Sequence, residues 1–324
     1  MRAAQVVRLD GPEAIEINQV PDAVAAEGHV LIEVHAAGVS FPDVLQTRGL
    51  YQYKPSMPFT PGSEVAGIVR SAPAGAAVRP GDRVAAFPGL GGFAELVAAA
   101  PEAVFPLPPR LSFAAGAALP MNYLTVEFAL GRRGRLQAGE TVLVHGAAGG
   151  VGTAAVQLAK AMGARVIAVV STDDKRAAAT AAGADDVVLA DGFLAAVKGL
   201  TSGRGVDLIV DPVGGDRFTD SLRSLAAEGR VLVIGFTGGE IPTVKVNRLL
   251  LNNTAVVGVG WGAFAMMRHG YLQQQWATLL PHLESGALDP ILGTSFPLDR
   301  TADALIELDQ RRATGKVILT VRPA

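Results

Sequence analysis

The chain has 324 residues, of which 49% are hydrophobic and 18% charged, a balance typical of well-packed globular proteins of about two domains. The formal net charge of −2 gives no basic field for nucleic acid or an anionic membrane, so we expect a small, fairly apolar substrate. The absence of cysteine excludes disulfides, thiolate metal sites and a cysteine nucleophile. The sequence shows no membrane-length apolar stretch and no signal-peptide core, which indicates a soluble, cytoplasmic protein.

The first third of the chain alternates short apolar runs with turn residues. Val30–His35 and Glu64–Val69 are two such runs, set apart by Gly and Pro. This pattern predicts a small, β-rich, partly open barrel. A Pro-punctuated segment over Pro101–Pro109 then leads to an expected helix over Phe113–Leu119, where the chain begins to cross into a second domain.

Six buried strands are expected in the second domain. Their near-continuous apolar runs alternate with helical stretches, which indicates a parallel sheet wound on both faces. A helix around Leu272–Leu283 and a terminal strand over Lys316–Val321 suggest a return to the first domain. The six runs are Thr141–His145, Arg165–Val170, Asp185–Leu189, Val206–Val210, Arg230–Gly235 and Ala255–Val259.

The turn between the first two of these strands is the most informative segment. Gly146–Gly152 follows a strand and opens a helix with an apolar face, as a dinucleotide-binding fingerprint requires. Ala147 replaces the first glycine, Gly149 lets the backbone approach a pyrophosphate, and Gly152 lets helix and strand pack closely. A phosphate would bind at the helix N-terminus. A glycine-rich turn alone is more often structural, but this context favours a nucleotide site.

The end of the second strand predicts which nucleotide binds. An NAD site usually has Asp or Glu there, bonded to the ribose 2′-hydroxyl. In this chain the strand is followed by Ser171, and Lys175 comes four residues later. A hydroxyl and a positive charge suit the 2′-phosphate of NADPH. The alternative is that Lys175 and Arg176 only solvate the start of a helix.

With these motifs in view, the chain resembles the medium-chain dehydrogenase/reductase superfamily over essentially its whole length, most closely its zinc-free quinone oxidoreductase branch. The resemblance implies an α/β fold with a doubly wound, parallel, six-stranded Rossmann sheet over 123–257. It also implies a β-rich, GroES-like substrate domain over 1–122 and 258–324, with the site in the cleft between them. The motifs are Ala36–Asp43, Pro61–Gly67, Gly81–Val84, Asn122–Thr125, Gly146–Gly152, Asp211–Gly215 and Ala313–Leu319.

The resemblance also predicts a reaction without metal. Zinc alcohol dehydrogenases of this superfamily would present Cys where Ser40 stands, His where Ser63 stands, and a third ligand near Met121. Glu64 is retained, but one carboxylate and two hydroxyls do not make a stable zinc site. Carbonyl polarisation by hydrogen bonds suits an acceptor that is already electron-poor, such as a quinone or an enone.

The resemblance implies roles for single residues. Asn122 and Trp261 line the cofactor pocket or belong to domain-interface core, and the glycines beside Trp261 favour an exposed platform for a flat ring. The pyrophosphate and nicotinamide ribose are expected to contact Thr125, Ala148, Gly149, Gly150 and Val151. The 2′-phosphate is expected to contact Ser171 and Lys175, and the nicotinamide edge is expected to contact Gly235, Phe236 and Thr237. Lys316 would reach the cofactor phosphates from the C-terminal segment.

The catalytic candidates are Ser40, Asp43 and Tyr51. Alternatively, Asp43 only braces its loop and Tyr51 forms a packing wall. We expect hydride transfer from NADPH to a small, flat acceptor, with quinones first and enones second. The branch usually has Asn at Ser40 and Tyr at Leu45, so a catalytically silent NADPH-binding protein is the competing interpretation.

The last expected strand of the sheet predicts a homodimer. Thr254–Val259 is apolar and β-branched, with no charge or proline to blunt an open pairing edge. Pairing with a two-fold copy would extend two sheets into one, and members of the resembled family commonly associate there. The alternative is that the helix around Leu272–Leu283 covers this edge in a monomer.

Overall fold

The computed structural model describes residues 1–322 of the chain. These residues form two compact units. The first unit contains 1–121, 269–278 and the segment from 292 onward, and the second contains 122–268 and 279–291. The segments 258–268 and 279–291 therefore lie in the second unit, whereas the sequence placed them with the substrate domain.

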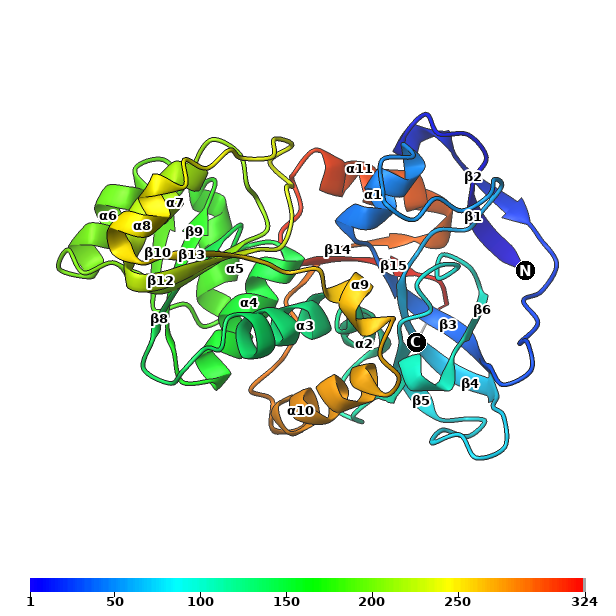
Figure 1. Ribbon diagram of the computed structural model, residues 1–324. Coiled ribbons are helices and arrows are strands. Elements are labelled where there is room, and N and C mark those ends of the chain that lie inside the picture. The colour runs from blue at the N-terminus through cyan, green and yellow to red at the C-terminus, as the bar shows by residue number, and fades with distance from the viewer. Residues whose placement is uncertain (323–324) are drawn as a thin grey trace. The chain divides into compact units, whose positions relative to one another are not determined.

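The second unit is built on a sheet with helices around it (Figure 1). The order of its strands is β10-β9-β8-β11-β12-β13. All five strand pairs are parallel, which confirms the doubly wound, six-stranded sheet. One strand begins earlier and ends earlier than expected, because a register shift lets β12 pair from Leu225 onward. The strands are β8 (Thr141–His145), β9 (Arg165–Val170), β10 (Asp186–Leu189), β11 (Val206–Asp211), β12 (Leu225–Val233) and β13 (Ala255–Gly258).

Helices cover both faces of this sheet, as the apolar strands require. On one face, Phe193 of α6 and Phe218 of α7 pack with Leu143 and Ile209 of the strands in one buried cluster. On the other face, α4 and α5 pack against β8 and β9. The helices of the unit are α3 (Pro120–Glu127), a π-helical turn Phe128–Arg133, α4 (Gly150–Ala161), α5 (Arg176–Ala181), α6 (Phe193–Leu200), α7 (Phe218–Ser224), α8 (Asn247–Asn252) and α9 (Trp261–Ala265).

The first unit is rich in antiparallel strands, as expected of the GroES-like domain. Its main sheet has the order β14-β15-β3-β4-β5-β7, with β6 also paired to β3, and β1 pairs with β2 separately. The strands are β1 (Arg2–Val6), β2 (Ile15–Gln19), β3 (Val30–Gly38), β4 (Glu64–Ser71), β5 (Arg83–Ala86), β6 (Leu96–Ala99), β7 (Val104–Pro106), β14 (Leu292–Pro297) and β15 (Lys316–Thr320).

The described residues contain further α-helices outside those of the second unit. The helix expected over Phe113–Leu119 ends at Ala117. The next helix, α3, begins at Pro120, because proline is favoured at the first position of a helix. In the described residues, no helix has the length and apolarity needed to cross a membrane. The helices are α1 (Phe41–Thr47), α2 (Phe113–Ala117), α10 (Tyr271–Ser285) and α11 (Thr301–Asp309).

Candidate active site and cofactor site

The glycine loop has the geometry of a phosphate cradle. Gly149 is the N-cap of α4, and a Cβ atom added there would meet only the Gly146 carbonyl, at 3.5 Å. A Cβ atom on Gly152 would lie 2.1 Å from that same carbonyl, so only glycine allows the helix to pack this closely on the loop. The N-terminus of α4 is therefore open to a ligand, and the loop beneath it is fixed.

This loop lies at the switch point of the sheet. β8 and β11 are neighbours. The chain runs from β8 through β9 to β10 on one side, then crosses back to β11 and continues through β12 to β13 on the other side. In open α/β sheets, ligands bind outside the carboxyl ends of the strands at such a point. The glycine loop follows the carboxyl end of β8, as a dinucleotide site requires.

Two further loops at this edge are tied to each other. The Asp211 carboxylate accepts the backbone N–H groups of Val213 and Gly214, each at 2.9 Å. The Thr237 hydroxyl donates to the Pro212 carbonyl at 3.0 Å, and the Thr237 N–H donates to the same carbonyl at 3.1 Å. The loop after β12, which includes the predicted residues 235–237, is thus held against the loop after β11.

The end of β9 presents the groups predicted to select NADPH. Ser171 is exposed and Lys175 is half-buried, at the same carboxyl edge of the sheet. Arg176 is engaged elsewhere, because its guanidinium donates to Asp173 and to the Val187 carbonyl. The contact of Ser171 and Lys175 with a 2′-phosphate stays a prediction.

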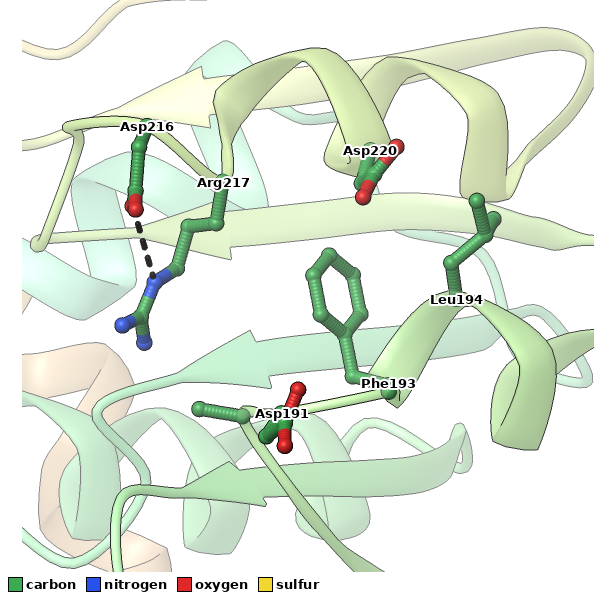
Figure 2. A pocket seen from close by; sticks show the side chains of 8 residues that line it. Asp191, Phe193, Leu194, Asp216, Arg217 and Asp220 are labelled. Atoms are coloured by element: carbon green, nitrogen blue, oxygen red, sulfur yellow. Dashed lines mark ion pairs between the residues drawn. The ribbon is translucent and has the colours of Figure 1, made fainter.

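A pocket of about 360 Å³ opens beside these loops. It is lined by residues 190–194 and by Asp216, Arg217 and Asp220. Figure 2 shows that the Phe193 ring and the Arg217 side chain enter it from the starts of α6 and α7. One aromatic ring, one guanidinium and several carboxylates suit a flat, uncharged base or sugar hydroxyls better than a phosphate. The donors and the cradle of this edge therefore fit a dinucleotide.

The first unit contains a buried polar cluster around Ser40. The Lys316 ammonium donates to the Ser40 hydroxyl at 2.7 Å and to the Glu64 carboxylate, and the Ser40 hydroxyl donates to Glu64 at 3.0 Å. The other oxygen of Glu64 accepts the Met121 N–H at 2.8 Å. Glu64 is fully buried and Lys316 is 4% exposed, so the two charges compensate each other away from water.

Asp43 adjoins this cluster and has an unusual ionisation. Its carboxylate accepts the Ser40 N–H at 2.8 Å and is 1% exposed. Burial raises the pKa of Asp43 to about 7, although the Ser40 N–H and the charge of Lys316 act in the opposite direction. A carboxyl group with such a pKa can exchange a proton near neutral pH.

Tyr51 lies within electrostatic reach of Asp43. Burial, followed by the negative charge of Asp43, raises the pKa of the Tyr51 hydroxyl, so this phenol keeps its proton at neutral pH. The three predicted catalytic residues thus lie in one region of the first unit. Asp43 accepts a hydrogen bond from the Ser40 N–H, and its charge contributes to the raised pKa of Tyr51.

Two predicted residues have surroundings that the sequence did not indicate. Trp261 is 4% exposed, so the expectation of an exposed platform was wrong. A Cβ atom added to Gly260 or Gly262 would meet nothing within 4 Å, so the neighbouring glycines do not decide whether the ring is buried. Lys316, predicted to reach the cofactor phosphates, points its ammonium at Ser40 and Glu64. Asn122 and Thr125 are buried as well. The cofactor roles of these residues stay predictions.

Sequence reasoning missed the ion pair that organises the Ser40 cluster. Glu64 and Lys316 are separated by 252 positions, and no local pattern links residues so far apart. The one available signal was the presence of an acid and a lysine inside apolar strands, where unpaired charges are rarely tolerated.

The same cluster decides whether the chain fits a metal. Within residues 1–322, no group of three or more His, Asp or Glu side chains converges as a metal site. At Ser40 and Glu64, the positive charge is supplied by the Lys316 ammonium. The donor set at this position does not fit zinc.

Comparison with known proteins agrees with these features. Residues 26–109 match the family model of the alcohol dehydrogenase GroES-like domain, and residues 150–285 match that of zinc-binding dehydrogenase. Quinone oxidoreductase-like protein 2 of Bos taurus is 38% identical over 325 residues, with 99% of this chain and 93% of the relative covered.

Solved structures are similar over the whole length. A probable oxidoreductase from Mycobacterium abscessus is 46% identical, with a TM-score of 0.91 and 99% of both chains covered. The quinone oxidoreductase of Thermus thermophilus, solved alone and with NADPH, is 37% identical, with a TM-score of 0.85 and coverage of 99% of this chain and 100% of that one.

Proposed function

Because the chain belongs to the medium-chain dehydrogenase/reductase superfamily, in its quinone oxidoreductase branch, we propose that it reduces quinones with NADPH. The observation that carries this proposal is the cradle at the switch point, where Gly152 packs on Gly146 and leaves the start of α4 open. NADPH supplies the hydride when it is bound.

The chain's own residues supply binding and orientation. The N–H groups at the start of α4 would hold the pyrophosphate. Ser171 and Lys175 would contact the 2′-phosphate, and the loop 235–237, fixed against Pro212, would bound the nicotinamide. The pocket beside Phe193 and Arg217 would take the adenosine end. Together these contacts would fix which face of the nicotinamide meets the acceptor.

The proton balance involves the first unit. Hydride addition to a quinone leaves a hydroquinone anion, which takes up one proton to give the hydroquinone. Tyr51 is the proposed donor to that oxygen, and Asp43, with its pKa near 7, is the proposed group that restores the proton. The single hydroxyl hydrogen of Ser40 is donated to Glu64, so Ser40 would act through its backbone N–H, which donates to Asp43 and positions that carboxyl group.

The test is NADPH oxidation, followed by absorbance, with a panel of quinones and enones. Turnover of quinones supports the proposal, whereas turnover of enones alone would make the protein a C=C reductase. NADPH binding without any turnover would make it a silent binder. Tyr51→Phe removes only the hydroxyl: a loss of about 10²-fold or more fits general acid catalysis, and unchanged turnover reduces Tyr51 to a wall residue.

We also propose a homodimer through β13. This strand ends the sheet, and Val256 on it is 37% exposed. The preceding helix α8 adds the exposed side chains of Leu250 and Leu251. An apolar helix beside an open strand suits a second copy of this chain.

A cytoplasmic location, inferred from the sequence, would be tested by cell fractionation.

The pairing of β13 identifies the variant that tests the dimer. The Val259 N–H donates to Val233 of β12, and N–H groups alternate in direction along a strand. The Val257 N–H therefore points toward β12, whereas the Val256 N–H points to the open edge. Val256→Pro would remove an N–H that donates across the proposed dimer interface. Val257→Pro would instead remove a hydrogen bond between β13 and β12 within one subunit.

A further inference from the structure

A buried histidine lies directly beneath the cofactor edge of the second unit. His145 is the last residue of β8, immediately before the glycine loop, and its side chain is fully buried. Its Nε2 atom lies 2.9 Å from the Ser221 hydroxyl on α7. The Phe193 ring meets the imidazole edge-on, with the ring centroids 5.0 Å apart.

The surrounding hydrogen bonds favour one tautomer of this histidine. Burial lowers the pKa of His145 to about 4, so the ring is neutral. The Ser221 hydroxyl donates its single hydrogen to the Arg217 carbonyl at 3.2 Å. We therefore assign the imidazole hydrogen to Nε2 for the 2.9 Å contact, and Nδ1 is then an acceptor.

A second buried acceptor lies on the neighbouring strand. Val210 pairs with Val144, so Asp211 and His145 are the next neighbours across β8 and β11. One carboxylate oxygen of Asp211 holds the turn at Val213 and Gly214. Within the described residues, neither the other oxygen of Asp211 nor Nδ1 of His145 has a hydrogen-bond partner.

These contacts join three parts of the site. The main chain of His145 enters the glycine loop, Asp211 shapes the turn beside it, and Phe193 and Arg217, which line the pocket, both contact the His145–Ser221 pair. We propose that His145 and Ser221 are positioning residues that hold the loop, the turn and the pocket wall in the arrangement that binds the cofactor. This inference rests on the proposed NADPH-dependent function.

Helix α7 provides a matched pair of variants. Ser221 and Ser224 are both fully buried, and each hydroxyl donates to the carbonyl four residues earlier. Only Ser221 contacts His145. Ser221→Ala and Ser224→Ala therefore remove the same atom from the same helix, but only the first releases the histidine.

The readouts are the Kd for NADPH from fluorescence titration, KM and kcat with a quinone, and Tm. Ser221→Ala should raise the Kd and KM for NADPH about three- to tenfold, the effect of one lost hydrogen bond, with kcat at saturating NADPH unchanged. Ser224→Ala should stay within about twofold in both constants. Equal NADPH constants in the two variants would overturn the proposal, whatever their Tm values.

A second pair keeps the test decisive if the serine variants are unstable. Asp211→Asn retains an oxygen for the turn and gives His145 Nδ1 a donor, so NADPH binding should be kept. Asp211→Ala removes both groups and should weaken it about tenfold or more. Equally weak binding by both would contradict the acceptor assignment. If the unmodified protein itself fails to bind NADPH, the proposed function fails instead.

Discussion

Replacing Asp43 with Asn should stabilise the protein at alkaline pH and hardly at all in acid. Asp43 is buried, and its pKa is raised from an ordinary 3.8 to about 7. Below pH 3.8, the pKa of Asp43 in the unfolded chain, the carboxyl group is protonated in both the folded and the unfolded state, so its burial does not require removing a charge from water. As the pH rises toward 7, the unfolded chain releases this proton first, and the native state loses stability until the folded pKa is passed.

The magnitude follows from the two pKa values. At about 1.4 kcal/mol per pKa unit, the rise to about 7 costs about 4 kcal/mol once the pH is above both. Asn is neutral throughout and can still accept the Ser40 N–H. The difference in the free energy of unfolding between Asp43→Asn and the unmodified protein should therefore increase by about 3 kcal/mol, in favour of the variant, from about pH 4.5 to about pH 8.

The assay is urea unfolding of both proteins at the two pH values. Asp10→Asn is the control: the Asp10 side chain is 69% exposed and pairs with the exposed Arg8, so the substitution should change stability by less than about 1 kcal/mol. Parallel pH profiles for Asp43→Asn and the unmodified protein would refute the raised pKa. In activity assays, kcat/KM of the unmodified enzyme should fall as pH rises through about 7, and the variant should lose this fall.

Further predictions concern the cofactor, the metal, the dimer and the glycine loop. Lys175→Ala should weaken NADPH by about 1–2 kcal/mol and leave NADH nearly unchanged in titrations; equal affinities of the unmodified protein for both cofactors would contradict this. Activity should survive strong chelators, and elemental analysis that finds one tightly held zinc would overturn the assignment of Lys316 as the local cation. Val256→Pro should dissociate the dimer in light scattering while Val256→Ala should not, and a monomeric parent at micromolar concentration would end the proposal. Gly152→Ala should destabilise the fold by about 1–3 kcal/mol in urea unfolding, because its Cβ has no room.

The sequence by itself determined the features that depend on local patterns. Near-continuous apolar runs such as Arg165–Val170 can be satisfied only inside a covered parallel sheet, so the strands and their burial were predictable. The glycine loop was predictable for the same reason: Gly152 is required by backbone contact with Gly146, a near neighbour in the sequence. The absence of an acidic residue directly after β9 was also visible in the sequence, once the end of that strand had been located.

The tertiary structure alone decided how charges and buried polar groups are satisfied. The Glu64–Lys316 pair closes over 252 positions, and the His145–Ser221 contact closes over 76, distances at which sequence periodicity carries no information. The burial of Trp261 and the raised pKa of Asp43 likewise depend on which segments pack around them. Local patterns specify strands and turns, whereas desolvation and pairing are set by neighbours that only folding brings together.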